Sequence, residues 1–275
     1  MSDNESEGSR QVMNHAEYKT MFELETFYWW FVARRKLLSE VVSGLGKSPD
    51  RTALLDVGCG TGLNYSVLSK FGKVFGADSS PQALLFGRSR RVENLVLSKA
   101  EDLQFPNEMF DVVTALDVLE HTDNDLTALR EMWRVMKPGG MLVVTVPAYG
   151  FLWSEHDEAL HHRRRYTAHE LRNKMTNAGF EVQRSTYFIT LLFFPIFLIR
   201  IWQNLTKRSL EAKTSHVILP KLLNSLLIRL LDLERFYLRW SNLPFGLTAL
   251  ATARKPEAAA ETVDDKSHST PPAAS

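Results

Sequence analysis

The chain has 275 residues, of which 44% are hydrophobic and 24% are charged, so it can bury one sizeable core with a small subdomain added. Its 33 Lys and Arg residues balance 32 Asp and Glu residues, which argues against a nucleic-acid partner because no overall basic field is present. The single cysteine, Cys59, excludes an internal disulfide and a cysteine-based zinc cluster, and it fits a reducing compartment such as the cytoplasm.

The two ends of the chain differ from its middle. Residues 1–14 and 256–275 are polar or of low complexity, and we expect them to be disordered. Residues 15–50 predict an N-terminal helical cap, because a helical pattern dense in aromatic side chains runs from Tyr18 to Val42. Either these aromatic side chains pack on the core, which is the preferred interpretation, or the helix forms a lid over bound ligands.

The most informative stretch is the motif Leu-Leu-Asp-Val-Gly-Cys-Gly-Thr-Gly at residues 54–62. Its apolar start predicts a buried parallel strand, and a helix is expected from residue 63 to about residue 71, with free N–H groups at its start that attract an anion. The loop between them lets the backbone approach a ligand because it contains three alternate glycines, Gly58, Gly60 and Gly62. Asp56 would repel a pyrophosphate but would hold an ammonium or sulfonium, so the motif favours a zwitterionic ligand.

The spacing of these glycines is neither the dinucleotide fingerprint nor a P-loop. With an acidic residue, an apolar residue and then G-x-G-x-G, the motif resembles the first motif of the class I S-adenosylmethionine-dependent methyltransferases. The resemblance implies an α/β fold: a Rossmann-like sheet of seven mostly parallel strands, helices on both faces and an antiparallel last strand. It also implies S-adenosylmethionine as the cofactor, and the branch that the chain looks like is the small-molecule, quinone-biosynthesis-like branch. Residues 51–187 are then the methyltransferase core, and residues 243–255 are its final strand.

Acidic residues follow the next two predicted strands. Asp78 ends the second strand, about 20 positions beyond the glycines, where a carboxylate can accept hydrogen bonds from both hydroxyls of a ribose. A third strand over residues 95–98 leads into a loop that lines the adenine in the resembled family, and Lys99 stands where that family frequently has Asp. Glu101 and Asp102 remain as candidates for the adenine contact, or they are solvated loop charges.

The fourth predicted strand ends near Leu116, which the resemblance places against the adenine face. The loop after this strand contains His121. Because histidine titrates near neutral pH, His121 is a candidate general base on a hydroxyl, or else it orients the loop. Members of the resembled family that methylate base amines carry Asn/Asp-Pro-Pro-aromatic here, whereas this chain has Ala-Leu-Asp-Val, which disfavours nucleic acid as the acceptor.

A fifth strand is predicted over residues 141–146, and the segment after Pro147 lies beyond its carboxyl end, where open α/β sheets place their ligands. His156, His161 and Tyr166 are candidates for proton transfer, and His156 is also a candidate for binding substrate. His156, Asp157 and His161 lack a known metal-ligand spacing, so no metal site is predicted. Three consecutive basic residues either receive a carboxylate or phosphate of the substrate or pair with local acids: Arg163, Arg164 and Arg165.

A capping box formed by Thr167 and Glu170 predicts a helix that begins directly after this segment. Further along, residues 188–242 are expected to form a hydrophobic helical insertion. Its apolar run over residues 188–199 is too short to span a bilayer, which takes about 20 residues, and residues 221–240 read as an amphipathic helix. The insertion closes a pocket over an apolar substrate, which is the preferred interpretation, or it rests on a membrane surface.

Together these features predict a cytoplasmic S-adenosylmethionine-dependent methyltransferase, with or without contact to a membrane surface. The acceptor is expected to be a small apolar, lipid-linked or glycan-linked molecule that is methylated on oxygen, nitrogen or carbon. Two alternatives remain: a non-catalytic module that binds the cofactor, and a peripheral membrane scaffold that recruits a partner through the apolar helices.

Overall fold

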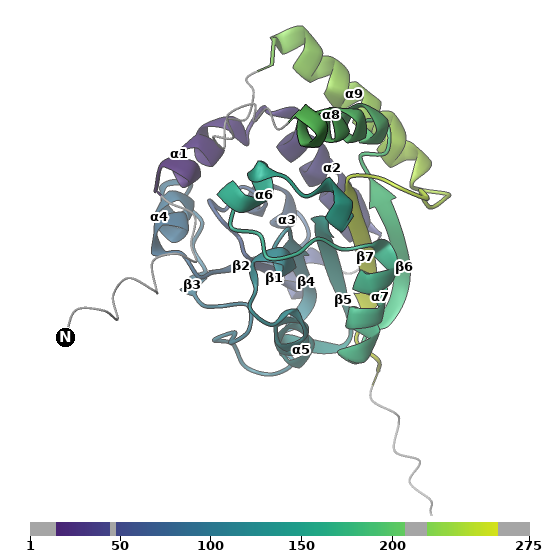
Figure 1. Ribbon diagram of the computed structural model, residues 1–275. Coiled ribbons are helices and arrows are strands. Elements are labelled where there is room, and N and C mark those ends of the chain that lie inside the picture. Colours follow the sequence, from purple (N-terminus) through teal and green to yellow (C-terminus); the bar gives the residue numbers. More distant parts are fainter. Residues whose placement is uncertain (1–14, 45–47, 207–218, 258–275) are drawn as a thin grey trace, which may run out of the picture.

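A seven-stranded sheet forms the centre of the structure, a computed structural model that describes residues 15–44, 48–206 and 219–257 (Figure 1). The strands follow the order β3-β2-β1-β4-β5-β7-β6, and β7 runs antiparallel to both of its neighbours. The strands are β1 (Ala53–Val57), β2 (Lys73–Asp78), β3 (Leu95–Leu97), β4 (Phe110–Leu116), β5 (Met136–Pro147), β6 (Glu181–Phe188) and β7 (Thr248–Arg254). The predicted Rossmann-like fold with an antiparallel last strand is therefore confirmed. Residues 1–14 and 256–275 were predicted to be disordered, and all of them except residues 256 and 257 lie outside the described part of the chain.

Helices cover both faces of this sheet (Figure 1). The helices are α1 (His15–Leu24), α2 (Trp29–Ser43), α3 (Tyr65–Leu68), α4 (Pro81–Ser89), α5 (Asp125–Val135), α6 (Glu155–Ala159), α7 (Ala168–Asn177), α8 (Phe193–Thr206) and α9 (Lys221–Tyr237). Side chains of β4 alternate between two cores: Val113 and Ala115 belong to the core with α5 and α7, and Val112 and Leu116 to the core with α2 and α9. Burial on both faces explains why this strand is nearly continuously apolar.

The N-terminal cap consists of two helices rather than the single helix predicted over residues 18–42. The break lies at Glu25, whose groups are bonded to distant parts of the chain. Its carboxylate accepts a hydrogen bond from the Thr61 hydroxyl and lies 2.7 Å from a guanidinium nitrogen of Arg90. Its carbonyl oxygen accepts a hydrogen bond from Arg35 at 2.5 Å. These tertiary contacts outweigh the local helical pattern from which the single helix was predicted.

The helix predicted over residues 63–71 is also shorter than expected. α3 contains four residues, and turns closed by hydrogen bonds from residue i to residue i−3 flank it on both sides. The Tyr65 amide bonds the Gly62 carbonyl at 3.2 Å before it, and the Phe71 amide bonds the Leu68 carbonyl at 2.9 Å after it. Because one helical turn sums few peptide dipoles, the anion attraction expected at this helix start does not follow from α3.

The predicted insertion, residues 188–242, contains α8 and α9 in its described part, and residues 207–218 between them lie outside it. α9 packs along α2, where Asp232 forms an ion pair with Lys36 at 2.6 Å. The buried carboxylate of Glu234 accepts the backbone N–H of Thr190 at 3.0 Å, which fixes the chain just before α8. Among the helices of the described residues, none combines the length and the apolar character needed to span a bilayer.

Candidate active site

The candidate active site lies at the edge of the sheet where the carboxyl ends of β1, β2 and β4 meet. The backbone of the glycine loop after β1 has positive φ angles of 63° at Gly58, 54° at Gly60 and 78° at Gly62. Residues that carry a side chain rarely adopt such angles. A Cβ at Gly58 would lie 2.4 Å from Cγ2 of Val118, and one at Gly60 would lie 3.2 Å from Cε of Met21. The loop therefore presents bare backbone between the exit of β4 and α1.

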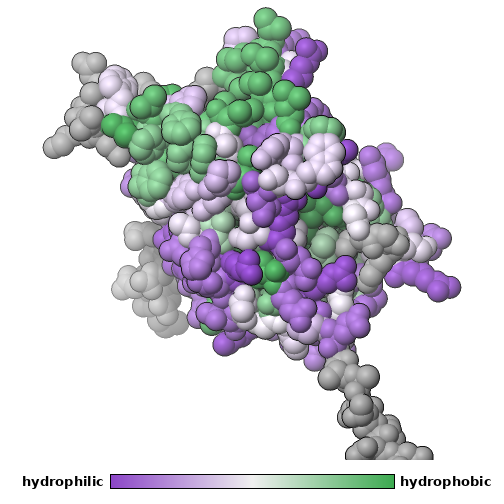
Figure 2. Space-filling model, turned by 90° about the vertical axis from the view of Figure 1, so that its right-hand side faces the viewer, coloured by the Kyte–Doolittle hydropathy of each residue, from purple (hydrophilic) through white to green (hydrophobic). Residues whose placement is uncertain are grey.

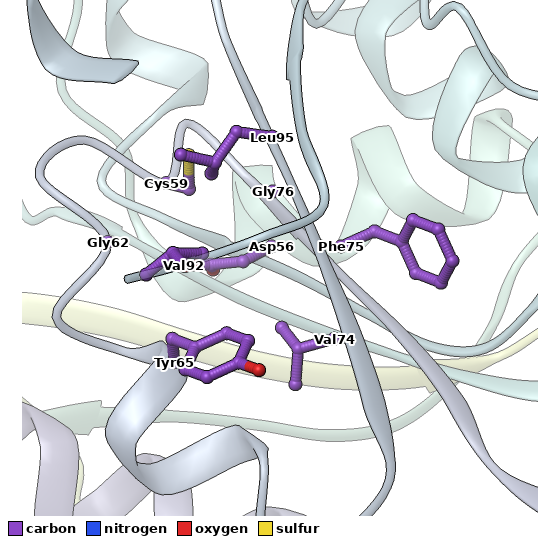
Figure 3. A pocket seen from close by; sticks show the side chains of 9 residues that line it. All are labelled: Asp56, Cys59, Gly62, Tyr65, Val74, Phe75, Gly76, Val92 and Leu95. Carbon is purple, nitrogen blue, oxygen red and sulfur yellow. The ribbon is translucent and has the colours of Figure 1, made fainter. Parts of the chain in front are cut away.

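Behind the glycine loop, toward β2 and β3, lies a small pocket (Figure 3). Its lining residues come from β1, the loop, α3, β2, the turn before β3 and the start of β3: Asp56, Cys59, Gly62, Tyr65, Val74, Phe75, Gly76, Val92 and Leu95. A Cβ at Gly76 would lie 2.9 Å from Sγ of Cys59, so the glycine loop packs closely against β2 at this point. The pocket is a small space left beside this contact. Burial raises the pKa of the Cys59 thiol well above its ordinary range, which keeps the thiol protonated.

Asp56, the acidic residue of the motif, ties the strands together below the loop. Its carboxylate is 2% exposed and accepts hydrogen bonds from the Thr114 hydroxyl at 2.6 Å and the Asn64 amide at 3.1 Å. Burial raises the pKa of Asp56, and these two hydrogen bonds oppose that rise. The contact predicted between Asp56 and a ligand cation stays a prediction, because both oxygens already have a partner within the protein.

Asp78 ends β2 beside the glycine loop, as predicted. One carboxylate oxygen accepts the backbone N–H of Gly60 at 2.8 Å, and the other accepts the N–H of Ser80 at 2.9 Å. Burial raises the pKa of Asp78 to about 6, against the effect of these two hydrogen bonds. Since each oxygen of a carboxylate accepts two hydrogen bonds, each retains capacity for one more. A fixed acceptor pair beside bare backbone fits the ribose of an adenosyl ligand.

The three residues predicted near the adenine occupy different environments. Glu101 accepts the backbone N–H of Asp123 at 2.8 Å and so links the loop after β3 to the loop after β4. Asp102 is exposed, and Leu116 is 6% exposed at the end of β4. The adenine contact of all three stays a prediction.

An ion pair that the sequence analysis did not single out lies at the exit of β4. Nη1 of Arg34, on α2, donates to Oδ2 of Asp117 at 2.6 Å, while Oδ1 accepts from the Thr145 hydroxyl at 3.1 Å. The Arg34 guanidinium lies 4.3 Å from the centre of the Trp30 ring, and Asp117 has a φ of 56°. The aromatic and basic residues of α2 were the sequence signal from which this ion pair could have been found, but they do not indicate Asp117 as the partner of Arg34. The ion pair joins α2 to the exit of β4. The two alternatives for the cap, packing on the core or forming a lid over bound ligands, stay predictions.

Glu120, which is buried, forms a cluster with the partly buried His121 and His162 next to this ion pair. Each offers one ligand atom, these atoms lie within 4.8 Å of one another, and the group could hold a metal ion. Neither carboxylate oxygen of Glu120 has a hydrogen-bond partner among the described residues, and burial raises its pKa well above the ordinary range. Burial lowers the pKa of His121 to about 3, so its imidazole is neutral at pH 7. The Nδ1 atom of His162 lies 2.9 Å from Asp157, which orients that ring.

Tyr166 is buried in the core rather than exposed to the site. Its hydroxyl donates to Asp125 at 2.9 Å, and burial raises its pKa. The hydroxyl therefore anchors the segment on α5, and the proton-transfer role predicted for it stays untested. The capping box of Thr167 and Glu170 is present at the start of α7, as predicted.

The basic run pairs with local acids, which is the second of the two predicted alternatives. Arg163 pairs with Asp123 at 2.6 Å, Arg164 with Asp125 at 3.2 Å, and Arg165 with Asp157 at 2.7 Å. Substrate binding by these three arginines stays a prediction, because each of them already has an anionic partner.

The two remaining candidates are histidines in or near α6. His161 is exposed in a turn with a φ of 55°. His156 lies in α6, and its side chain lies outside the described part of the structure. Among the described side chains, no contact places His161 against the glycine loop. The roles of both histidines stay predictions.

The strand order, the bare glycine loop after β1 and the acceptor carboxylate after β2 define a class I S-adenosylmethionine-dependent methyltransferase domain. A family model described as a methyltransferase domain matches residues 55–144, from within β1 to within β5. The chain therefore contains a domain of this class, whose cofactor is S-adenosylmethionine.

Two of the relatives in sequence are methyltransferases named for ubiquinone biosynthesis and for a hydroquinone. The ubiquinone biosynthesis O-methyltransferase of Cereibacter sphaeroides is 35% identical over 96 residues, which cover 33% of this chain and 39% of the relative. The 2-methyl-6-phytyl-1,4-hydroquinone methyltransferase of Synechocystis is 34% identical over 121 residues, which cover 42% of this chain and 36% of that relative. The chain thus spans less than half the length of these two relatives.

A solved structure extends the likeness to the fold. The phosphoethanolamine N-methyltransferase 2 of Haemonchus contortus, in complex with S-adenosyl-L-methionine, superimposes with a TM-score of 0.53 at 20% identity. The match covers 81% of this chain and 52% of that chain. At this sequence identity, the match supports the fold alone.

Proposed function

We propose that the protein is an enzyme that transfers a methyl group from S-adenosylmethionine to oxygen, nitrogen or carbon of a small apolar acceptor. The observation that carries this proposal is a wall of aromatic rings after the carboxyl end of β5. The Tyr149 ring stacks on Tyr187 at 5.2 Å and on Phe151 at 5.0 Å, and Phe193 of α8 lies 5.7 Å from it. Flat apolar rings such as quinols and phenols suit such faces. The quinone-related acceptors named for the two relatives support the same class.

Each part of the site has a separate task in this reaction. The bound cofactor supplies a methyl group on a sulfonium, which is already a good leaving group. Asp78 would orient the ribose through its two free acceptor positions, and the bare backbone at Gly58 and Gly60 allows close approach. Because the leaving group is good, proximity and orientation supply most of the acceleration, and a base is needed only for a weakly acidic acceptor.

His121 is the base that this proposal favours. Its imidazole is neutral at pH 7, so one ring nitrogen can accept a proton, although its lowered pKa makes it a weak base. We expect the enzyme to act in the cytoplasm, in keeping with its single buried cysteine.

The test is methyl transfer from S-adenosylmethionine labelled in the methyl group. The purified chain is incubated with a panel of quinols, phenols and lipid extracts, and label is followed into the organic phase. Calorimetric titration with S-adenosylhomocysteine is run beside it. Binding together with transfer supports the enzyme. Binding without transfer to any member of the panel would favour the non-catalytic cofactor-binding module instead, and no binding by folded protein would overturn both.

A further inference from the structure

Apolar side chains gather on the outer surface of α8 and α9, which Figure 2 shows at the top of the molecule. We call this surface the α8–α9 face. Its large exposed side chains in α8 are Phe194, Leu198, Ile199, Ile201 and Trp202, and those in and just after α9 are Leu222, Leu223, Leu226, Leu233, Phe236, Tyr237 and Trp240. Leu222 is 84% exposed and Trp240 is 72% exposed, which is costly for side chains of this size in water.

The α9 part of the face is a stripe with helical spacing. Leu222, Leu226, Leu233, Phe236 and Trp240 follow one another at intervals of three, four or seven residues, so they line one side of the helix. The opposite side of α9 packs on the protein, where two further leucines are buried, Leu231 and Leu238. The stripe is therefore additional to the side that the fold needs, and its apolar character is not explained by packing within the described residues.

Positive charge is concentrated in the same segment. Residues 188–240 contain eight Lys or Arg residues and three Asp or Glu residues, a net charge of +5, whereas the whole chain has a net charge of +1. Several of these charges are engaged within the protein. Asp232 pairs with Lys36, Glu234 is buried on the amides before α8, and Arg235 and Arg239 both pair with Glu40 of α2. Lys221 and Arg229 are exposed on α9 beside the apolar stripe. The face thus combines apolar and cationic groups, while the rest of the chain carries a net negative charge.

We propose that the α8–α9 face docks on an anionic lipid bilayer, with both helices lying in the interface. Apolar side chains would enter the headgroup region, the basic groups would meet lipid phosphates, and the tryptophans would lie at the boundary. The negative charge on the remainder of the chain would orient the protein with this face toward the lipid.

The docked arrangement connects the bilayer to the aromatic wall of the site. α8 contributes Phe193 and Phe197 to that wall, where Phe197 lies 5.8 Å from Phe151. Its outer side belongs to the α8–α9 face, so one helix contacts lipid and wall together. This part of the inference rests on the proposed function, because it requires an apolar acceptor that is taken from the bilayer.

The test is flotation of the full chain with vesicles, which needs neither cofactor nor acceptor. Neutral vesicles of phosphatidylcholine are compared with vesicles that also contain phosphatidylglycerol. We expect the protein to float with the anionic vesicles and, more weakly, with the neutral ones. Replacing Lys221 and Arg229 by alanine should weaken binding to the anionic vesicles by about fivefold for each charge and leave binding to neutral vesicles nearly unchanged.

A double variant tests the apolar contribution. Leu226→Glu with Leu233→Glu should abolish flotation, and Leu85→Glu is the control, because this leucine is similarly exposed on α4. Circular dichroism and S-adenosylhomocysteine binding should be unchanged in both, which separates failure of docking from failure of the cofactor site.

Two outcomes would overturn the proposal. One is equal flotation of the wild type and the Leu226→Glu, Leu233→Glu variant. The other is a wild-type dimer in light scattering that this variant converts to a monomer without any binding to vesicles, since a second copy of the chain would then cover the face.

Discussion

Replacing Asp78 by asparagine tests the assignment of the cofactor site most directly. In the protein, the two oxygens of Asp78 hold Gly60 and Ser80 through backbone N–H groups at 2.8 and 2.9 Å, and each keeps one acceptor position for a ribose hydroxyl. Two hydrogen bonds to a charged acceptor are worth about 3 kcal/mol together, or about 100-fold in the dissociation constant. Asparagine keeps the shape but lacks the charge and turns an N–H₂ group toward one of these donors. We therefore expect the affinity for S-adenosylhomocysteine to fall by about that factor.

The pH dependence provides a second signature of the same carboxylate. Because burial raises the pKa of Asp78 to about 6 in the folded protein, the carboxyl becomes protonated as the pH falls through 6 and loses acceptor capacity. The affinity of the wild type should be constant from pH 8 to pH 7 and should weaken between pH 6 and pH 5. The Asp78→Asn variant should show no such dependence in this range.

Folding stability follows the same linkage. A pKa raised in the folded state means that Asp78 contributes stability below its unfolded value of 3.8, and this contribution is lost as the pH rises through 6.

Isothermal calorimetry from pH 5 to pH 8 measures the affinity, and Asp50→Asn, an exposed acid in the turn before β1, is the matched control. Wild-type affinity in the Asp78→Asn variant, or an unchanged pH profile, would refute the assignment.

Three further predictions concern the loop, the buried cluster and the core. Gly58→Ala should abolish cofactor binding and cost roughly 1–3 kcal/mol, because the new Cβ would lie 2.4 Å from Val118 at a positive φ; retained binding in calorimetry would contradict this. Glu120→Gln should raise the free energy of unfolding at pH 8, because the raised pKa of Glu120 means that the wild type loses stability as the pH rises above 4.5. The free energies of unfolding of the variant and the wild type should converge toward pH 4. Parallel pH profiles of stability in denaturation experiments would argue against this. Tyr166→Phe should cost about 1 kcal/mol through the lost hydrogen bond to Asp125 and leave methyl transfer unchanged, and a fall in transfer rate at constant stability would restore Tyr166 as a catalytic residue.

Much of the cofactor site could be predicted from the sequence because its signals are local. The apolar run of β1, the glycines after it and Asp78 at the end of β2 follow one another within 25 residues, and each has a direct backbone consequence. The capping box of α7 is equally local, since Thr167 and Glu170 satisfy each other's N–H groups.

Contacts between distant segments could not be predicted in this way. Arg34 and Asp117 are 83 residues apart, and a basic residue on an aromatic helix does not indicate which acid it will meet. The break between α1 and α2 depends on Glu25, whose partners Thr61 and Arg90 lie on other elements. The pattern of residues 18–42 remains helical throughout, so the turn appears only when the chain is folded.

The sequence by itself determined the strand before the glycine loop, the bare backbone of that loop and the position of Asp78, because periodicity, glycine and strand ends act over a few residues. The seven-stranded sheet followed from the resemblance to a known family. Tertiary structure alone decided what the charged residues do. It paired Arg163, Arg164 and Arg165 with acids and left Glu120 buried without a partner among the described residues. The physical reason is that the energy of a charge depends on its burial and on its neighbours, and both are set by segments that meet only in the folded chain.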